Sequence, residues 1–298
     1  MSRPFSTLAL VLLSGLSALS ATQRQIAFER GAAIWIANAD GTSPKKIAKG
    51  SAPDLSPDGR RIAFHTDTST SKDVIRQIAV VDVATKRVTV FKEQIPSENC
   101  QRAVWSPDGT RILFNIWSNN DWDLAMINAD GTGFRYVKKA TPKGNSFWSA
   151  CWAPDGQSIY AQNLSDFCQL GLDGTEIKKW AIGTIFAKGG LSSDTNFSVS
   201  PNGKKLALDV EMTEEETDLP DWNGPPPSIW IFDLESETAT RLTKKKVGAW
   251  HPCWLTNDTV LYCTQMHGEK APTIYRRTVA QDQPTRILPD ANNPSVSH

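Results

Sequence analysis

Ser56-Pro57-Asp58-Gly59 is the first of several nearly identical tetrapeptides that recur along this chain. The later copies are Ser106–Gly109, Ala153–Gly156 and Ser200–Gly203, and a degenerate copy, Leu255–Asp258, follows Trp254. The prolines of the first four copies are 50, 47 and 47 residues apart. Repeats of about 40–50 residues made of short β-rich runs are typical of β-propellers, in which each repeat forms one four-stranded sheet, a blade. The spacing therefore predicts an all-β propeller.

Each repeat divides into four expected strands, named a to d. Strand a ends just before the tetrapeptide, as at 102–105, and strand b follows it, as at 111–115. Strand c is the next β-branched or aromatic run, as at 228–232, and strand d is shorter, as at 239–242. Asp-Gly pairs such as Asp40-Gly41 stand between c and d, where a tight hairpin needs a positive φ angle.

The two ends of the chain complement each other. The first β-rich runs, 25–30, 33–38 and 45–48, read as strands b, c and d with no strand a before them. The last run, Pro294–Ser297, reads like Phe197–Ser200 at the end of another strand a. We therefore predict that the C-terminal strand joins the N-terminal blade, which closes the ring and pairs its open edges. Strand b is expected to start near residues 25, 61, 111, 158, 205 and 259, which predicts six blades of four antiparallel strands within one domain, 22–298.

The first 21 residues have the pattern of a secretory signal peptide. Arg3 supplies the positive charge, Leu8–Leu19 the apolar stretch, and Ser20-Ala21 the small residues before cleavage. The apolar stretch is too short to span a bilayer, so we expect no membrane insertion once it is removed. The mature chain is then periplasmic or secreted. It keeps 31 basic and 32 acidic residues without a basic patch, which argues against a nucleic-acid partner.

The repeats resemble a known family. With Trp105, Trp152 and Trp254 before the turns, and Asn-Ala-Asp-Gly hairpins at 38–41 and 128–131, the chain is similar to TolB-type six-bladed propellers, a WD-repeat-like family. The likeness covers nearly the whole predicted mature chain. Its motifs are specific for the fold, but propellers of this kind serve many tasks.

The resemblance implies a binding role in the cell envelope. TolB itself carries an α/β domain ahead of its propeller, and its inner-membrane contact maps to that domain. Only about four residues separate the predicted signal peptide from the first strand here, so we expect no such α/β domain ahead of this propeller. The family's contact with the peptidoglycan-associated lipoprotein lies on the propeller, so an envelope protein of that kind is an expected partner, and a glycan is another. We expect a monomer without a cofactor.

Long connections gather on one face of the predicted ring. The b–c and d–a connections, such as 92–101 and 181–195, are long, whereas the a–b and c–d turns are short. Binding residues commonly lie on long loops held by a rigid scaffold. The aromatic side chains in or beside these loops could form a platform for a sugar ring or for the apolar anchor of a partner, or could instead cap the blade cores. The candidate binding residues are Trp117, Trp122, Trp148, Trp222, Trp250 and His251.

An enzyme on the same fold is the alternative. Related propellers that cleave pectin fragments hold a metal with a histidine cluster, and two or three of His65, His251 and His267 could converge near the channel mouth. Such an enzyme would be a carbohydrate lyase or hydrolase. The sequence contains no G-x-S-x-G turn, Walker loop or dinucleotide fingerprint, and we assign no catalytic or metal-binding residue.

The acidic segment 210–227 does not match a calcium loop. Cys253 and Cys263 flank one hairpin, and a disulfide between them is left open.

Overall fold

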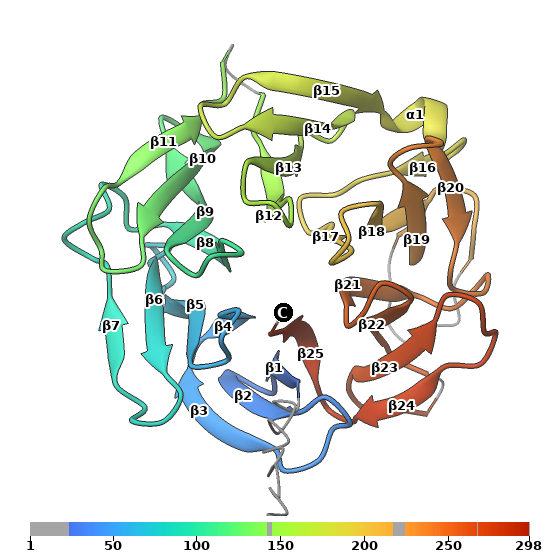
Figure 1. Cartoon of the computed structure of the whole chain (residues 1–298), viewed down its shortest axis with the longest axis horizontal. Coiled ribbons are helices and arrows are strands. Elements are labelled where there is room, and N and C mark those ends of the chain that lie inside the picture. Colours follow the sequence, from blue (N-terminus) through green and yellow to red (C-terminus); the bar gives the residue numbers. More distant parts are fainter. Residues whose placement is uncertain (1–23, 142–144, 217–223, 267, 298) are drawn as a thin grey trace, which may run out of the picture.

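The computed structural model describes residues 24–141, 145–216, 224–266 and 268–297, which form a closed ring of six sheets around a central axis (Figure 1). Blade 1 contains β25 (Asn292–Val296), β1 (Gln25–Glu29), β2 (Ala33–Asn38) and β3 (Lys45–Lys49). Blade 2 contains β4 (Ser51–Leu55), β5 (Arg61–Asp67), β6 (Arg76–Asp82) and β7 (Val88–Val90). Blade 3 contains β8 (Cys100–Trp105), β9 (Arg111–Ser118), β10 (Asp121–Asn128) and β11 (Arg135–Lys138).

The second half of the ring repeats this plan. Blade 4 contains β12 (Trp148–Trp152), β13 (Ser158–Gln162), β14 (Asp166–Gly171) and β15 (Glu176–Ala181). Blade 5 contains β16 (Gly189–Gly190), β17 (Phe197–Val199), β18 (Lys205–Met212), β19 (Pro227–Asp233) and β20 (Thr238–Arg241). Blade 6 contains β21 (Ala249–Trp254), β22 (Thr259–Thr264), β23 (Thr273–Thr278) and β24 (Thr285–Leu288). Strand b begins at the six predicted positions, so the predicted fold class is confirmed.

The recurrent tetrapeptide works as one hydrogen-bonded unit. Ser56 Oγ donates to Asp58 Oδ1 over 2.6 Å and accepts the N–H of Arg61 over 2.9 Å. Gly59 has a φ of 70°, a left-handed conformation that other residues adopt only at a cost. The Ser106 and Ser200 copies repeat the same pair of side-chain bonds. The repeat is therefore explained by the turn that carries strand a into strand b.

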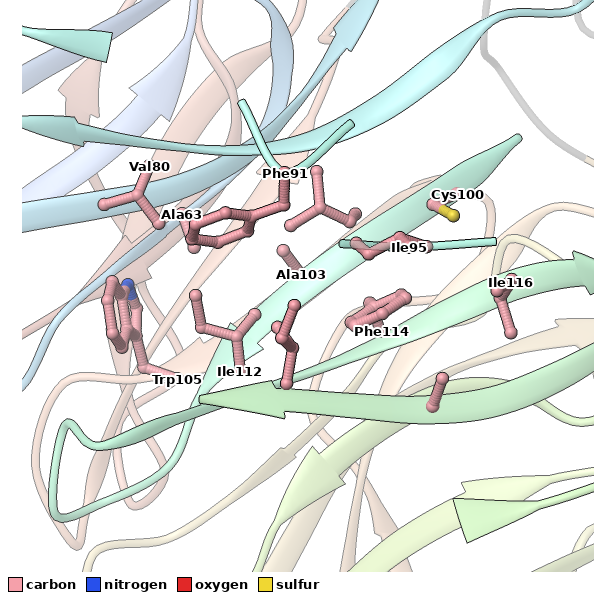
Figure 2. Close-up of a cluster of buried hydrophobic side chains, with 13 residues drawn as sticks. Ala63, Val80, Phe91, Ile95, Cys100, Ala103, Trp105, Ile112, Phe114 and Ile116 are labelled. Atoms are coloured by element: carbon pink, nitrogen blue, oxygen red, sulfur yellow. The ribbon is translucent and has the colours of Figure 1, made fainter. Parts of the chain in front are cut away.

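Neighbouring blades are joined by contacts that also repeat. The guanidinium carbon of Arg61 in blade 2 lies 4.5 Å from the ring centre of Trp105 in blade 3, and Arg61 Nη2 donates to Gly109 O over 3.0 Å. Arg111 makes the same pair of contacts with Trp152 and Gly156 in blade 4. Figure 2 shows the buried cluster between blades 2 and 3, in which Trp105 packs with side chains of both blades. The three predicted core tryptophans, Trp105, Trp152 and Trp254, are all buried.

The ring closes as the sequence predicts. Strand β25 pairs antiparallel with β1, with Val296 opposite Ile26 and Ser295 opposite Ala27 (Figure 1). Val296 is 3% exposed and packs in the same cluster as Ile26 and Phe28. The last strand of the chain is therefore the innermost strand of its first blade.

The structure adds three observations to the predicted fold. The inner edge of blade 5 is split into β16 and β17, with the short helix α1 (Ile182–Ile185) before it. The cysteines are free thiols, so the possible Cys253–Cys263 disulfide is absent. Nowhere in the described ranges does a helix have the length and apolar character needed to cross a membrane. The predicted signal peptide lies outside the described residues.

Candidate functional site

The central channel encloses a cavity of about 870 Å³. Innermost strands from all six blades line it. Each innermost strand runs from the long-loop face toward the tight-turn face, so the channel has two different ends. At the tight-turn end the wall includes the repeat prolines Pro57, Pro107, Pro154 and Pro201. At the long-loop end, called the mouth below, it carries ionisable side chains.

A bulge bends the innermost strand in most blades just below the mouth. The register shifts between Ser51 and Asp54 in blade 2, and equivalent shifts occur in blades 1, 3, 4 and 6. The bulged residue has a positive φ of 49–57° in each of the five, an uncommon conformation for residues other than glycine. Bulges are frequent beside functional sites because they redirect a side chain. Together with the equivalent residue of blade 5 these positions form a ring, here called the bulge ring: Ala52, Arg102, Ser149, Asn196, His251 and Asn293.

Arg102 in this ring links three blades. Its Nη1 donates to Ser149 Oγ of blade 4 over 3.2 Å and to Asn196 Oδ1 ahead of β17. Its Nη2 donates to the backbone oxygen of Asp194 over 2.8 Å and lies 3.4 Å from the carboxylate of the same residue. Arg102 is not among the binding residues predicted from the sequence, although an alignment of the repeats on the last residue of strand a places it at the bulge.

Two carboxyl groups in the channel wall hold a proton more tightly than usual. Burial raises the pKa of Asp209 to about 7, although the Asn196 N–H and the charge of Arg102 oppose the shift. Burial also raises the pKa of Asp54 to about 6, against hydrogen bonds from Ser295 and from the N–H of Trp105. Asp54 thereby joins blade 2 to blades 1 and 3, through 2.6 Å and 2.7 Å bonds.

Two histidines in the same wall favour the neutral form. Burial, followed by the charge of Arg102, lowers the pKa of His251 to about 3. Asn292 Oδ1 accepts from His251 Nδ1 over 3.1 Å and from Trp250 Nε1 over 2.9 Å, which fixes both side chains at the mouth. Burial, followed by the charge of Arg76, lowers the pKa of His65 to about 4. Near neutral pH the wall therefore carries uncharged imidazoles.

The candidate aromatic binding residues lie in two separate places, across blades 3 and 4 and along the channel. Trp122 lies 5.4 Å from Trp117 and 5.6 Å from Trp148 between ring centres, so these three form a row across blades 3 and 4, here called the tryptophan row. Trp122 is 8% exposed, whereas Trp117, at the end of β9, is 37% exposed. Trp250 and His251 line the channel instead. Trp222 lies outside the described residues.

The remaining loop features do not extend the site. Phe147 and Phe186, which also stand in long loops, are buried in blade cores. In the acidic segment, Glu215 forms a two-pronged ion pair with Arg241, over 2.5 Å and 2.8 Å. Within the part of the chain that the structure describes, no group of three or more His, Cys, Asp or Glu residues could hold a metal ion. His267, the third histidine of the metal hypothesis, lies outside that part.

Comparison with known proteins places the fold. No protein-family model and no curated protein matches the chain. Among solved structures, TolB from Acinetobacter baumannii is 17% identical with a TM-score of 0.67; the match covers 92% of this chain and 66% of that protein, so this chain spans about two thirds of its length. A putative TolB from Agrobacterium tumefaciens is 14% identical with a TM-score of 0.63, over 89% of this chain and 88% of that one.

Enzymes share the architecture as well. An oligogalacturonate lyase from Vibrio parahaemolyticus is 15% identical with a TM-score of 0.52, over 84% of this chain and 72% of that one. Identities this low carry the fold and leave the task open. In fold, the chain is a six-bladed β-propeller of the TolB type.

Proposed function

We propose that this protein is an exported, non-enzymatic scaffold that binds an envelope protein or a glycan through its long-loop face. The observation that carries the proposal is the tryptophan row, which reaches the surface at Trp117, near the end of β9 on the long-loop side. Aromatic side chains held on strands offer a large contact area at a low cost in conformational entropy. An envelope protein such as a peptidoglycan-associated lipoprotein would supply an apolar anchor, and a glycan would stack a sugar ring.

A double variant tests this surface. Trp117→Ala and Trp250→Ala together should weaken capture of the purified peptidoglycan-associated lipoprotein, or of purified peptidoglycan, by about tenfold or more, as expected for aromatic contact residues. Ile177→Ala is the matched control, because Ile177 is an exposed apolar residue, 58% exposed, on the outer strand β15. Equal capture by the double variant and the control would reject the proposed surface.

Export has its own test. The predicted signal peptide ends at Ala21, so the protein recovered from the periplasm or the medium should begin at Thr22. N-terminal sequencing of the recovered protein reads this directly. A recovered chain that still begins at Met1 would contradict the proposal.

A carbohydrate lyase or hydrolase is the second candidate. Two uncharged imidazoles, His65 and His251, and two carboxyl groups with raised pKa values, Asp54 and Asp209, line one cavity. Perturbed titrating groups that gather in a cavity are frequent at catalytic sites. Polygalacturonate incubated with the protein should then yield unsaturated products for a lyase, or new reducing ends for a hydrolase, and His251→Gln should remove the activity. Unchanged polymer would exclude that substrate and favour the scaffold.

A further inference from the structure

Arg76 presents a guanidinium group that is held in place, yet no carboxylate of the described residues lies within salt-bridge distance of it. Its Nε donates to Asn99 Oδ1 over 3.1 Å and its Nη1 to Gln101 Oε1 over 2.7 Å. Both acceptors are neutral amides, and Arg76 forms no ion pair with any residue that the structure describes. Asp67 stands opposite Arg76 in the β5–β6 register, but the two charged groups are not in salt-bridge contact. The Nη2 group therefore remains available at the channel wall, which Arg76 lines.

His65 lies in the same wall, two residues before Asp67 on β5. It is only 8% exposed, and its Nδ1 is sealed in the protein with no hydrogen-bond partner. A buried N–H without an acceptor is rarer in proteins than an unpaired acceptor atom, so the proton of the neutral ring belongs on Nε2. Nε2 has no partner among the described residues either and is not sealed off, and His65 borders the cavity. The ring thus offers an unused N–H to the channel.

The surroundings of these two donors favour a negative group. Two cations, Arg76 and Arg102, act on His65 against one anion, the carboxylate of Asp67, which already accepts the N–H of Ser69 over 2.9 Å. The carboxyl groups of Asp209 and Glu211 belong to blade 5, across the ring from blade 2 (Figure 1). Glu29 of blade 1 is satisfied by donors, because its Oε2 accepts hydrogen bonds from the Ala52 N–H and from Asn293 Nδ2. Between blades 2 and 3 the wall therefore combines an unpaired cation with a neutral donor.

We propose that Arg76 and His65 bind the carboxylate group of a small organic acid inside the channel. Two N–H donors match the two oxygens of a carboxylate, and a charge-assisted bond from a positioned guanidinium is among the stronger polar contacts. The cavity, at about 870 Å³, has the size of small-molecule binding sites. The acid is either free or the acidic group of a sugar. This ligand differs from the protein or glycan proposed for the long-loop surface.

Matched probe pairs test the proposal by isothermal titration calorimetry on the full mature chain. Glucuronate and glucose differ at the carboxylate, so glucuronate should bind at least about tenfold more tightly, and succinate should bind as well. Equal affinity for glucuronate and glucose, or no binding of either acid, would overturn the proposal. Acetyl-diglycine and its amide form a second pair. If only the free peptide acid binds, the carboxylate comes from a protein chain and the small-acid assignment is wrong.

Variants then locate the site. Arg76→Gln should lower the affinity for glucuronate about tenfold or more, and His65→Leu should lower it severalfold, whereas Arg87→Gln, on an exposed arginine of the same blade, should leave it unchanged. Arg76→Lys keeps the charge and should retain an intermediate affinity, which also covers the case that Arg76→Gln does not fold. Thermal unfolding of each variant establishes that it is folded. Wild-type affinity in folded Arg76→Gln would place the carboxylate elsewhere and overturn the assignment.

Discussion

The two ends of the central channel are built on opposite principles. At the tight-turn end, blades 2, 3 and 5 repeat one unit, in which a serine hydroxyl bonds the third residue of the turn and the first N–H of strand b. At the mouth, the six positions of the bulge ring carry five different types of side chain, from Ala52 to Arg102, and only asparagine occurs twice. Repetition marks the turn by which these three blades lead strand a into strand b. Variation at equivalent positions marks where single blades are free to acquire a chemical role.

The largest expected effect comes from breaking the ring itself. Deleting residues 294–298 removes most of β25, including the buried Val296 and the hydroxyl of Ser295 that accepts the Leu55 N–H. We expect the protein to lose at least about 10 °C of melting temperature, or to fail to fold, because a buried side chain and several ladder hydrogen bonds are lost together. Differential scanning calorimetry measures the shift.

A point variant separates the strand from its side chain. Val296→Ala keeps the backbone ladder and should cost only about 2 kcal/mol of unfolding free energy. If the deletion melts at the wild-type temperature, β25 does not hold the ring together, and the closure inferred from the two chain ends is wrong.

A substitution of Asp54 tests whether the stability of the channel wall depends on a single residue that joins neighbouring blades. Its carboxyl group accepts the Trp105 N–H and the Ser295 hydroxyl, so Asp54→Ala leaves both without this partner in the protein interior. We expect a loss of about 2–4 kcal/mol of unfolding free energy, measured by urea denaturation. Ser198→Ala is the matched control, because Ser198 accepts the Trp254 N–H from the equivalent position of blade 5. It should cost about 1 kcal/mol, and equal losses would refute a special role for Asp54.

The same contrast explains what sequence reasoning could predict. The turn residues are short-range signals, because Ser56, Asp58 and Gly59 satisfy one another within a few residues. The ring and its closure followed from counting those turns. The network of Arg102 was beyond such reasoning, because its partners lie 47 and 94 residues away and meet it only when the ring closes. The long-loop face was predicted from loop lengths, but the burial of Trp122 in β10 depends on neighbours from two blades.

The pH dependence of the unfolding free energy tests the protonation of Asp209 at the mouth. Its pKa is about 7 in the folded protein and near the ordinary value of 3.8 when unfolded. Between pH 4 and 7 the folded state therefore binds the extra proton, and the contribution of Asp209 to stability falls as pH rises. Asp209→Asn does not titrate, so its unfolding free energy relative to wild type should increase by about 1–3 kcal/mol from pH 4 to pH 8.

The comparison with wild type removes the opposing histidine effect. His65 and His251 have lowered pKa values, so the unfolded state binds more protons than the folded state below about pH 6.5, and both histidines add stability as pH rises. These terms are present in wild type and in Asp209→Asn alike and cancel in the difference. Urea denaturation at several pH values measures this difference in unfolding free energy between Asp209→Asn and wild type. A difference that does not change with pH would show that Asp209 titrates normally in the fold.

The smallest expected effect tests the bulge ring directly. Ala52 has a φ of 50°, in the left-handed region that costs an alanine about 1–2 kcal/mol. Ala52→Gly relieves this strain, while the added freedom of glycine in the unfolded chain returns about 0.4–1 kcal/mol. The variant should therefore be more stable than wild type by roughly 0.5 kcal/mol. Ala103→Gly is the matched control, because Ala103 is buried beside a bulge without a positive φ, and it should lose about 1 kcal/mol. Equal losses in both variants would show that the bulge at Ala52 is unstrained, and that the mouth is free to vary without any cost stored in its backbone.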